Sequence, residues 1–228
     1  MIIEWVIASA ASIASAIGSA CLVGTILVKR GFSRAFAEIA ASGVAQVMAA
    51  SVILYFMTKV GLTSLFTVNV SPQLLVTWSV ITVVALLMVV LSDRVSDSVS
   101  APVVKEFLAL YRVCKPCFFI LLLLVAPVCE EILFRGATQA WLATIIGAWP
   151  ALLVAVATFT LSHVRALGFS KALISVAVLA MLLGLPVALY GTLIPSMITH
   201  ALCNLVGMRN VLISSRTNQL AKLMGGSK

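Results

Sequence analysis

A succession of long apolar segments, separated by short polar connections, constrains the fold of this chain more than any other feature of its sequence. Of its residues 62% are hydrophobic and only 10% are charged, whereas a soluble domain is nearer half apolar and a quarter charged. A single core cannot bury so much apolar surface, so lipid must be the solvent for most of it. The sequence therefore predicts an all-α fold, a polytopic membrane helical bundle.

Segment length and the placement of charge divide the chain into about seven transmembrane helices. The fourth is long and contains Pro127, so we expect it to tilt or kink. We expect one integral-membrane domain, 1–228, in which 209–228 is a flexible basic cytoplasmic tail. The expected spans are 2–28, 36–59, 74–92, 116–146, 149–168, 172–189 and 192–208.

The Lys and Arg residues predict the orientation of the bundle. Most of the fifteen follow the first, third, fifth and seventh spans, which by the positive-inside rule places the amino terminus outside and the carboxyl terminus in the cytoplasm. Because this pattern accounts for the net charge of +8, we expect the lipid bilayer as a partner and no nucleic acid. The first span is too long for a signal-peptide core, so we expect it to stay. The short connections favour a prokaryotic cell membrane.

The connection between the third and fourth spans carries two further patterns. Residues 103–112 place apolar side chains at helical spacing between charged ones, which is typical of a surface amphipathic helix. The "CKPC" sequence at 114–117 has the spacing of a redox motif, but no thioredoxin-like pattern surrounds it. The odd number of cysteines, five, argues against a disulfide framework.

The stretch "VCEEILFRG", 128–136, places Glu130, Glu131 and Arg135 at membrane depth. A charged side chain at the centre of a bilayer costs at least about 2.5 kcal/mol, so such groups persist when they are paired or face a water-filled cavity. Glu131 and Arg135 are four residues apart, in the order that favours an ion pair. Glu130 is rotated from Glu131 by about 100° and is left without that partner.

The only two histidines of the chain lie in other spans. "FTLSH" sets Phe159 and His163 four residues apart, and "HALCN" does the same for His200 and Asn204. Their depths along the spans allow Glu130, both histidines and Asn204 to meet near the middle of the membrane. By contrast, Gln46 and Gln139 are isolated polar residues within the second and fourth expected spans. We interpret them as residues that serve helix packing.

These side chains suit the hydrolysis of an amide. A carboxylate in a partly dry pocket can act as a general base toward water, and donors such as His and Asn can stabilise the oxyanion. Glu130, His163 and His200 are also a possible catalytic zinc set, with water as the fourth ligand. The pattern is not HExxH, so metal dependence stays open.

The motifs "EEILFR", "FTLSH" and "HALCN", in this order on three helices, resemble the CPBP family. These are the CAAX protease and bacteriocin-processing intramembrane proteases, which include the Ras-converting CAAX endopeptidases. The resemblance covers about 125–206, which we expect to be the catalytic core. It implies an intramembrane endopeptidase with a peptide or membrane-protein substrate: a prenylated CAAX-type tail, a leader peptide or a membrane-proximal segment.

The resemblance also implies a role for each matched residue, on helices 4, 5 and 7. His163 would activate water beside the catalytic glutamate, and His200 with Asn204 would stabilise the oxyanion. The implied catalytic residues are Glu130, His163, His200 and Asn204, and the implied supporting residues are Glu131, Arg135 and Phe159. The family has been described both as zinc metalloproteases and as glutamate-dependent enzymes without an essential metal.

Two other function classes remain open. One is a non-catalytic membrane protein that acts in immunity or regulation by binding. The other is a proton-coupled transporter, since intramembrane Glu and His also suit proton relays. The chain shows no internal repeat of the kind that transporters often carry, so peptide hydrolysis is the leading prediction.

Overall fold

The computed structural model describes residues 2–32, 34–95, 111 and 115–223. Throughout these residues the regular elements are helices, and they include no β-strand. The prediction of an all-α polytopic bundle is confirmed. Apart from Tyr111, the surface helix expected at 103–112 lies outside the described residues, as does the first cysteine of the "CKPC" sequence.

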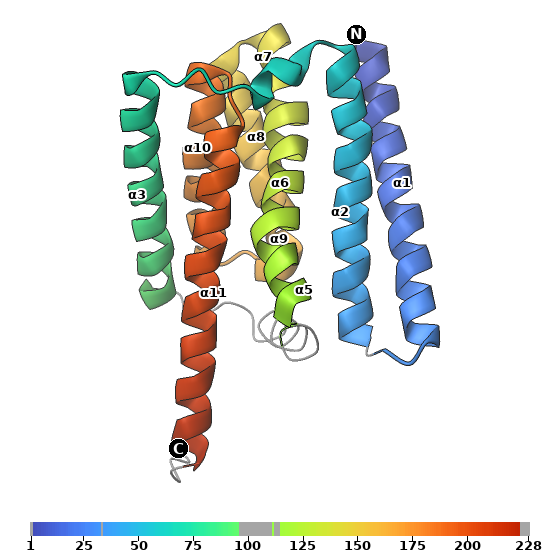
Figure 1. Cartoon of the computed structure of the whole chain (residues 1–228), viewed down its shortest axis with the longest axis vertical. Coiled ribbons are helices and arrows are strands. Elements are labelled where there is room, and N and C mark those ends of the chain that lie inside the picture. The colour runs from blue at the N-terminus through green and yellow to red at the C-terminus, as the bar shows by residue number, and fades with distance from the viewer. Residues whose placement is uncertain (1, 33, 96–110, 112–114, 224–228) are drawn as a thin grey trace.

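The long helices run side by side and form the bundle shown in Figure 1. The first two form an antiparallel pair at one edge, the third lies at the opposite edge, and the remaining helices lie between them (Figure 1). The elements outside the fourth span are α1 (Ile2–Lys29), α2 (Arg34–Lys59), η1 (Leu62–Phe66), α3 (Pro72–Val95), α8 (Ala148–Ser162), α9 (Val164–Leu167), α10 (Lys171–Tyr190) and α11 (Ile194–Leu223).

The fourth span is one continuous helix whose turns change in pitch along its length. Two of its segments are π-helical, with i→i+5 hydrogen bonds, and Pro127 lies at the start of the α-helical segment between them. Gly147, at φ 87°, ends the helix with a backbone conformation that favours glycine. Its segments are α5 (Lys115–Ile120), η2 (Leu121–Val125), α6 (Ala126–Glu131), η3 (Ile132–Ala140) and α7 (Trp141–Ile146).

Two expected spans differ from the observed helices. The fifth, expected at 149–168, ends at Ser162, and a turn at His163 leads into the short α9. The seventh, expected at 192–208, continues to Leu223, and Figure 1 shows its lower end extending beyond the other helices. The segment expected as a tail, 209–228, is therefore helical up to Leu223, while its flexibility stays a prediction.

Length and composition identify membrane-crossing helices in the described part of the chain. Four of the described helices, α1, α2, α3 and α10, contain a segment that is long and apolar enough to cross a membrane. A further helix, α8, is apolar but shorter. Large apolar side chains such as Ile13 and Leu22 on α1 and Val83 on α3 are exposed. Lipid is the solvent that such a surface needs, so the chain is an integral membrane protein.

Candidate active site

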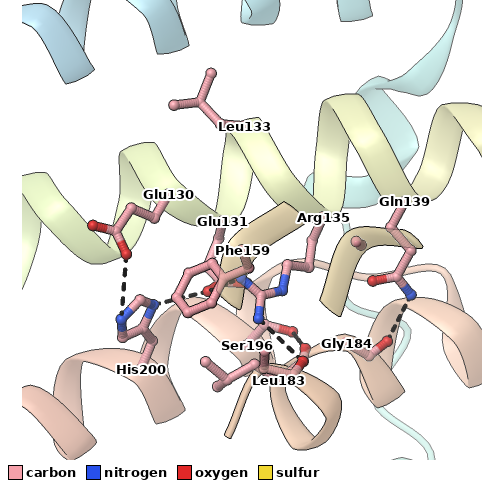
Figure 2. A network of polar contacts seen from close by, with 12 residues as sticks. Glu130, Glu131, Leu133, Arg135, Gln139, Phe159, Leu183, Gly184, Ser196 and His200 are labelled. Atoms are coloured by element: carbon pink, nitrogen blue, oxygen red, sulfur yellow. Dashed lines mark hydrogen bonds and ion pairs between the residues drawn. The ribbon is translucent and has the colours of Figure 1, made fainter. Parts of the chain in front are cut away.

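The fourth span directs a row of three polar side chains into the bundle. Glu131, Arg135 and Gln139 are spaced by four residues and are at most 1% exposed. Figure 2 shows Arg135 and Gln139 reaching toward α10 from one side of this helix, whereas Leu133 points the opposite way. Residues four apart lie on the same side of a helix, and this row continues from the end of α6 into η3.

Arg135 has three partners within the bundle. Its Nη1 lies 3.2 Å from Oε1 of Glu131, which confirms the ion pair predicted from their spacing. Its Nη2 donates to the carbonyl of Ala180 on α10 at 3.1 Å, and its guanidinium carbon lies 4.4 Å from the centre of the Phe159 ring. The buried charge is thus balanced by a carboxylate and further stabilised by a backbone oxygen and an aromatic face.

The carbonyls of α10 near its internal proline, Pro186, accept from side chains of other helices. Gln139 Nε2 donates to the carbonyl of Gly184 at 2.8 Å, and Ser196 Oγ donates to that of Leu183 at 2.6 Å. A proline inside a helix removes one backbone donor. The carbonyl that Pro186 leaves without a backbone donor is that of Leu182, four residues earlier. The side-chain hydrogen bonds to the neighbouring carbonyls of Leu183 and Gly184 join α10 to α11 and η3.

The imidazole of His200 lies between the two carboxylates (Figure 2). Its Nδ1 lies 2.8 Å from Oε1 of Glu131, and its Nε2 lies 3.7 Å from Oε2 of Glu130. A carboxylate oxygen without a proton can only accept, so Nδ1 carries the hydrogen that binds Glu131. His200 is 4% exposed, and its Nε2 is the nitrogen that faces Glu130.

Glu130 is held differently from its neighbour. Its side chain is 16% exposed, against 0% for Glu131, and its Oε1 accepts a hydrogen bond of 3.4 Å from Gln46 Nε2. The interpretation of Gln46 as only a helix-packing group is therefore incomplete, because this residue reaches the carboxylate from α2. A polar residue in an apolar span was the one sequence signal that could have indicated it.

His163 belongs to the same region through Phe159. Its Nδ1 lies 2.9 Å from the Phe159 carbonyl and 3.1 Å from Ser162 Oγ, and its ring lies 4.6 Å from the Phe159 ring. The Phe159 ring also lies 6.0 Å from that of His200. Among the described residues, Glu130 has a hydrogen bond with Gln46 and an ion-pair contact with His200. Asn204, on α11 one turn after His200, is half-buried.

The residues considered for zinc do not form a metal cluster in this arrangement. In the part of the chain that the structure describes, no group of three or more His, Cys, Asp or Glu side chains is close enough to hold a metal ion. Glu130, His163 and His200 therefore do not fit a zinc site as they stand.

Two adjacent glutamates, one of them fully buried, lie with an arginine and a histidine inside a helical membrane bundle. These residues define a class of protein with a polar intramembrane site. Comparison with known families identifies it further. Residues 113–206 match the family described as "Type II CAAX prenyl endopeptidase Rce1-like". This match contains all three motifs, so it confirms the resemblance to the CAAX proteases, and at the level of the family it indicates an endopeptidase. No match was found among the curated proteins or the solved structures.

Proposed function

We propose that the chain is an intramembrane endopeptidase in which Glu130 is the general base. The observation that carries this proposal is the position of the Glu130 carboxylate. The neighbouring Glu131 forms the ion pair with Arg135, while Glu130 is partly exposed and faces Nε2 of His200 at 3.7 Å. The endopeptidase family matched by residues 113–206 supports the same reaction.

In the proposed reaction, Glu130 removes a proton from water as the water attacks the carbonyl carbon of the scissile peptide bond. His163 assists as an acceptor. Its Nδ1–H donates to the Phe159 carbonyl, so in the neutral ring Nε2 is free of hydrogen and can accept from the same water. The proton taken from water then passes to the amine that leaves.

His200 and Asn204 are proposed to stabilise the oxyanion. For this His200 must carry hydrogens on both nitrogens, because Nδ1–H is already bound to Glu131. The resulting positive charge, with that of Arg135, balances the two carboxylates. A group of four charges that sums to zero suits a site without bulk water.

Glu131, Arg135 and Phe159 are proposed to support this site. Glu131 fixes the orientation of the His200 ring through Nδ1, and Arg135 fixes Glu131. The Phe159 ring contacts both the Arg135 guanidinium and the His163 ring, each of which lies within 5 Å of its centre. The supporting residues therefore determine where the two imidazoles lie.

The proposed substrate is a peptide or a membrane protein, and a prenylated CAAX-type tail is the form that the name of the matched family suggests. A leader peptide or a membrane-proximal segment would use the same chemistry. We further propose a prokaryotic cell membrane, with the amino terminus outside, the carboxyl terminus in the cytoplasm, and catalysis that depends on glutamate without an essential metal.

The test is cleavage of fluorogenic peptides, prenylated and unprenylated, by the purified protein in lipid nanodiscs, with and without a chelator. Glu130→Gln keeps the size of the side chain and removes its charge, so we expect cleavage to be lost. The matched control is Glu38→Gln, which changes an exposed carboxylate of α2 and should leave cleavage unchanged.

Cleavage at the wild-type rate by Glu130→Gln would contradict the proposal. Peptide binding without turnover, equal in both proteins, would favour the non-catalytic alternative. Inhibition by the chelator, reversed by zinc, would contradict the glutamate-only mechanism.

A further inference from the structure

One face of α2 packs against the fourth span and is apolar except at one position. Gly43, Gln46, Ala50, Ile53 and Met57 recur three or four residues apart, which places them on one side of the helix. Ala50, Ile53 and Met57 are buried in the core cluster that includes residues of α6 and η3. A Cβ added at Gly43 would lie 2.7 Å from a leucine side chain of η2, so the two helices approach closely there.

Gln46 is the polar member of this face. A side-chain amide in an apolar contact is unfavourable unless it has a hydrogen-bond partner. The partner of Gln46 is Glu130, on another helix and 84 residues away in the sequence. One oxygen of the Glu130 carboxylate thus lies near Gln46 Nε2, at 3.4 Å, and the other lies near His200 Nε2, at 3.7 Å.

We infer that Gln46 is a positioning residue that fixes the orientation of the Glu130 carboxylate. The inference rests on the proposed function in taking Glu130 as the general base. A neutral amide suits this role because it donates a hydrogen bond to one oxygen without adding a charge to the site. Gln46 lies outside the region 113–206 that matches the endopeptidase family. The second helix, α2, therefore contributes directly to the site.

The first test compares kcat and KM for variants of Gln46. Gln46→Met has nearly the same length and no donor, and we expect kcat to fall about three- to tenfold, as for loss of one weak hydrogen bond to a charged group. KM should change little, because Gln46 acts through Glu130. Gln46→Asn retains the amide but is one methylene shorter, so it should show the same loss.

Ala50→Gly is the packing control on the same face; it should lower the unfolding temperature and leave kcat unchanged. A wild-type kcat in both Gln46 variants would overturn the inference.

A second measurement does not depend on activity. The unfolding temperatures of the wild type, Gln46→Met, Glu130→Ala and the double variant form a double-mutant cycle. We expect Gln46→Met to lower the unfolding temperature less in the Glu130→Ala background than in the wild type. Additive shifts would overturn the contact between the two side chains. If the wild type cleaved no peptide, the proposed function would fail, and this cycle would still decide whether Gln46 holds Glu130.

Discussion

Nδ1 of His200 lies 2.8 Å from Oε1 of Glu131. The same oxygen lies 3.2 Å from Nη1 of Arg135, so one buried carboxylate oxygen joins a histidine of α11 to an arginine of η3. Two adjacent glutamates therefore have different environments. Glu131 is fully buried and shared between two partners, whereas Glu130 is partly exposed and forms no ion pair with Arg135 among the described contacts.

Removing the Glu131 carboxylate should be strongly destabilising. We expect Glu131→Leu to lower the free energy of unfolding by about 3–5 kcal/mol, because it leaves the buried charge of Arg135 without its partner. The double variant Glu131→Leu/Arg135→Met should recover much of this stability, since both charges are then gone. It should still fail to cleave peptide, because His200 has lost the acceptor for Nδ1. Thermal unfolding and peptide cleavage measure the two effects, and a double variant less stable than Glu131→Leu would contradict the charge argument.

A hydrogen-bond cluster beside His200 gives a second prediction. Thr199 is 1% exposed; its Oγ1 accepts from Trp78 Nε1 at 3.0 Å and lies 2.8 Å from Thr82 Oγ1. Thr199→Val keeps the shape but leaves the indole N–H without its acceptor, so we expect a loss of about 1–3 kcal/mol of unfolding free energy.

The control for Thr199 is Thr77→Val on the same helix as Trp78. Thr77 forms its hydrogen bond to the Tyr190 hydroxyl in an exposed position, so the change should alter the unfolding temperature much less. Because Thr199 directly precedes His200, the Thr199 variant should also lower kcat. An unchanged kcat, with the expected loss of stability, would show that the cluster holds α3 and α11 together without positioning His200.

The features predicted correctly from sequence are those that depend on local spacing. Apolar runs of membrane-spanning length predict the helices, and a separation of four residues predicts the ion pair of Glu131 and Arg135, because both follow from the geometry of one helix. The three motifs also sufficed to predict the family. Each of these signals lies within a single segment of the chain.

The features that were missed depend on packing between segments. The π-helical pitch of η3 cannot be predicted from propensity, since its side chains are held by carbonyls of Ala180 and Gly184 on α10. The contact of Gln46 with Glu130 joins distant parts of the sequence. The depth of the two histidines in the membrane also could not distinguish their roles. His200 faces both glutamates, whereas His163 contacts Phe159.

The close approach of α10 to α8 and the fourth span at Gly184 gives the last prediction. A Cβ at this position would overlap Cδ1 of Leu152 and lie 2.9 Å from Oε1 of Gln139, whose Nε2 donates to the Gly184 carbonyl. We expect Gly184→Ala to lower the free energy of unfolding by about 1–3 kcal/mol through overpacking. Adding Leu152→Ala makes room for the new methyl group, so the combined loss should be smaller than the sum of the two single losses.

Gly18→Ala on α1 is the control: no atom lies within 4 Å of the added Cβ, and alanine favours a helix over glycine by about 1 kcal/mol. Thermal unfolding of the four variants measures these effects. Equal stability of Gly184→Ala and the wild type would show that α10 can shift away from the fourth span without loss.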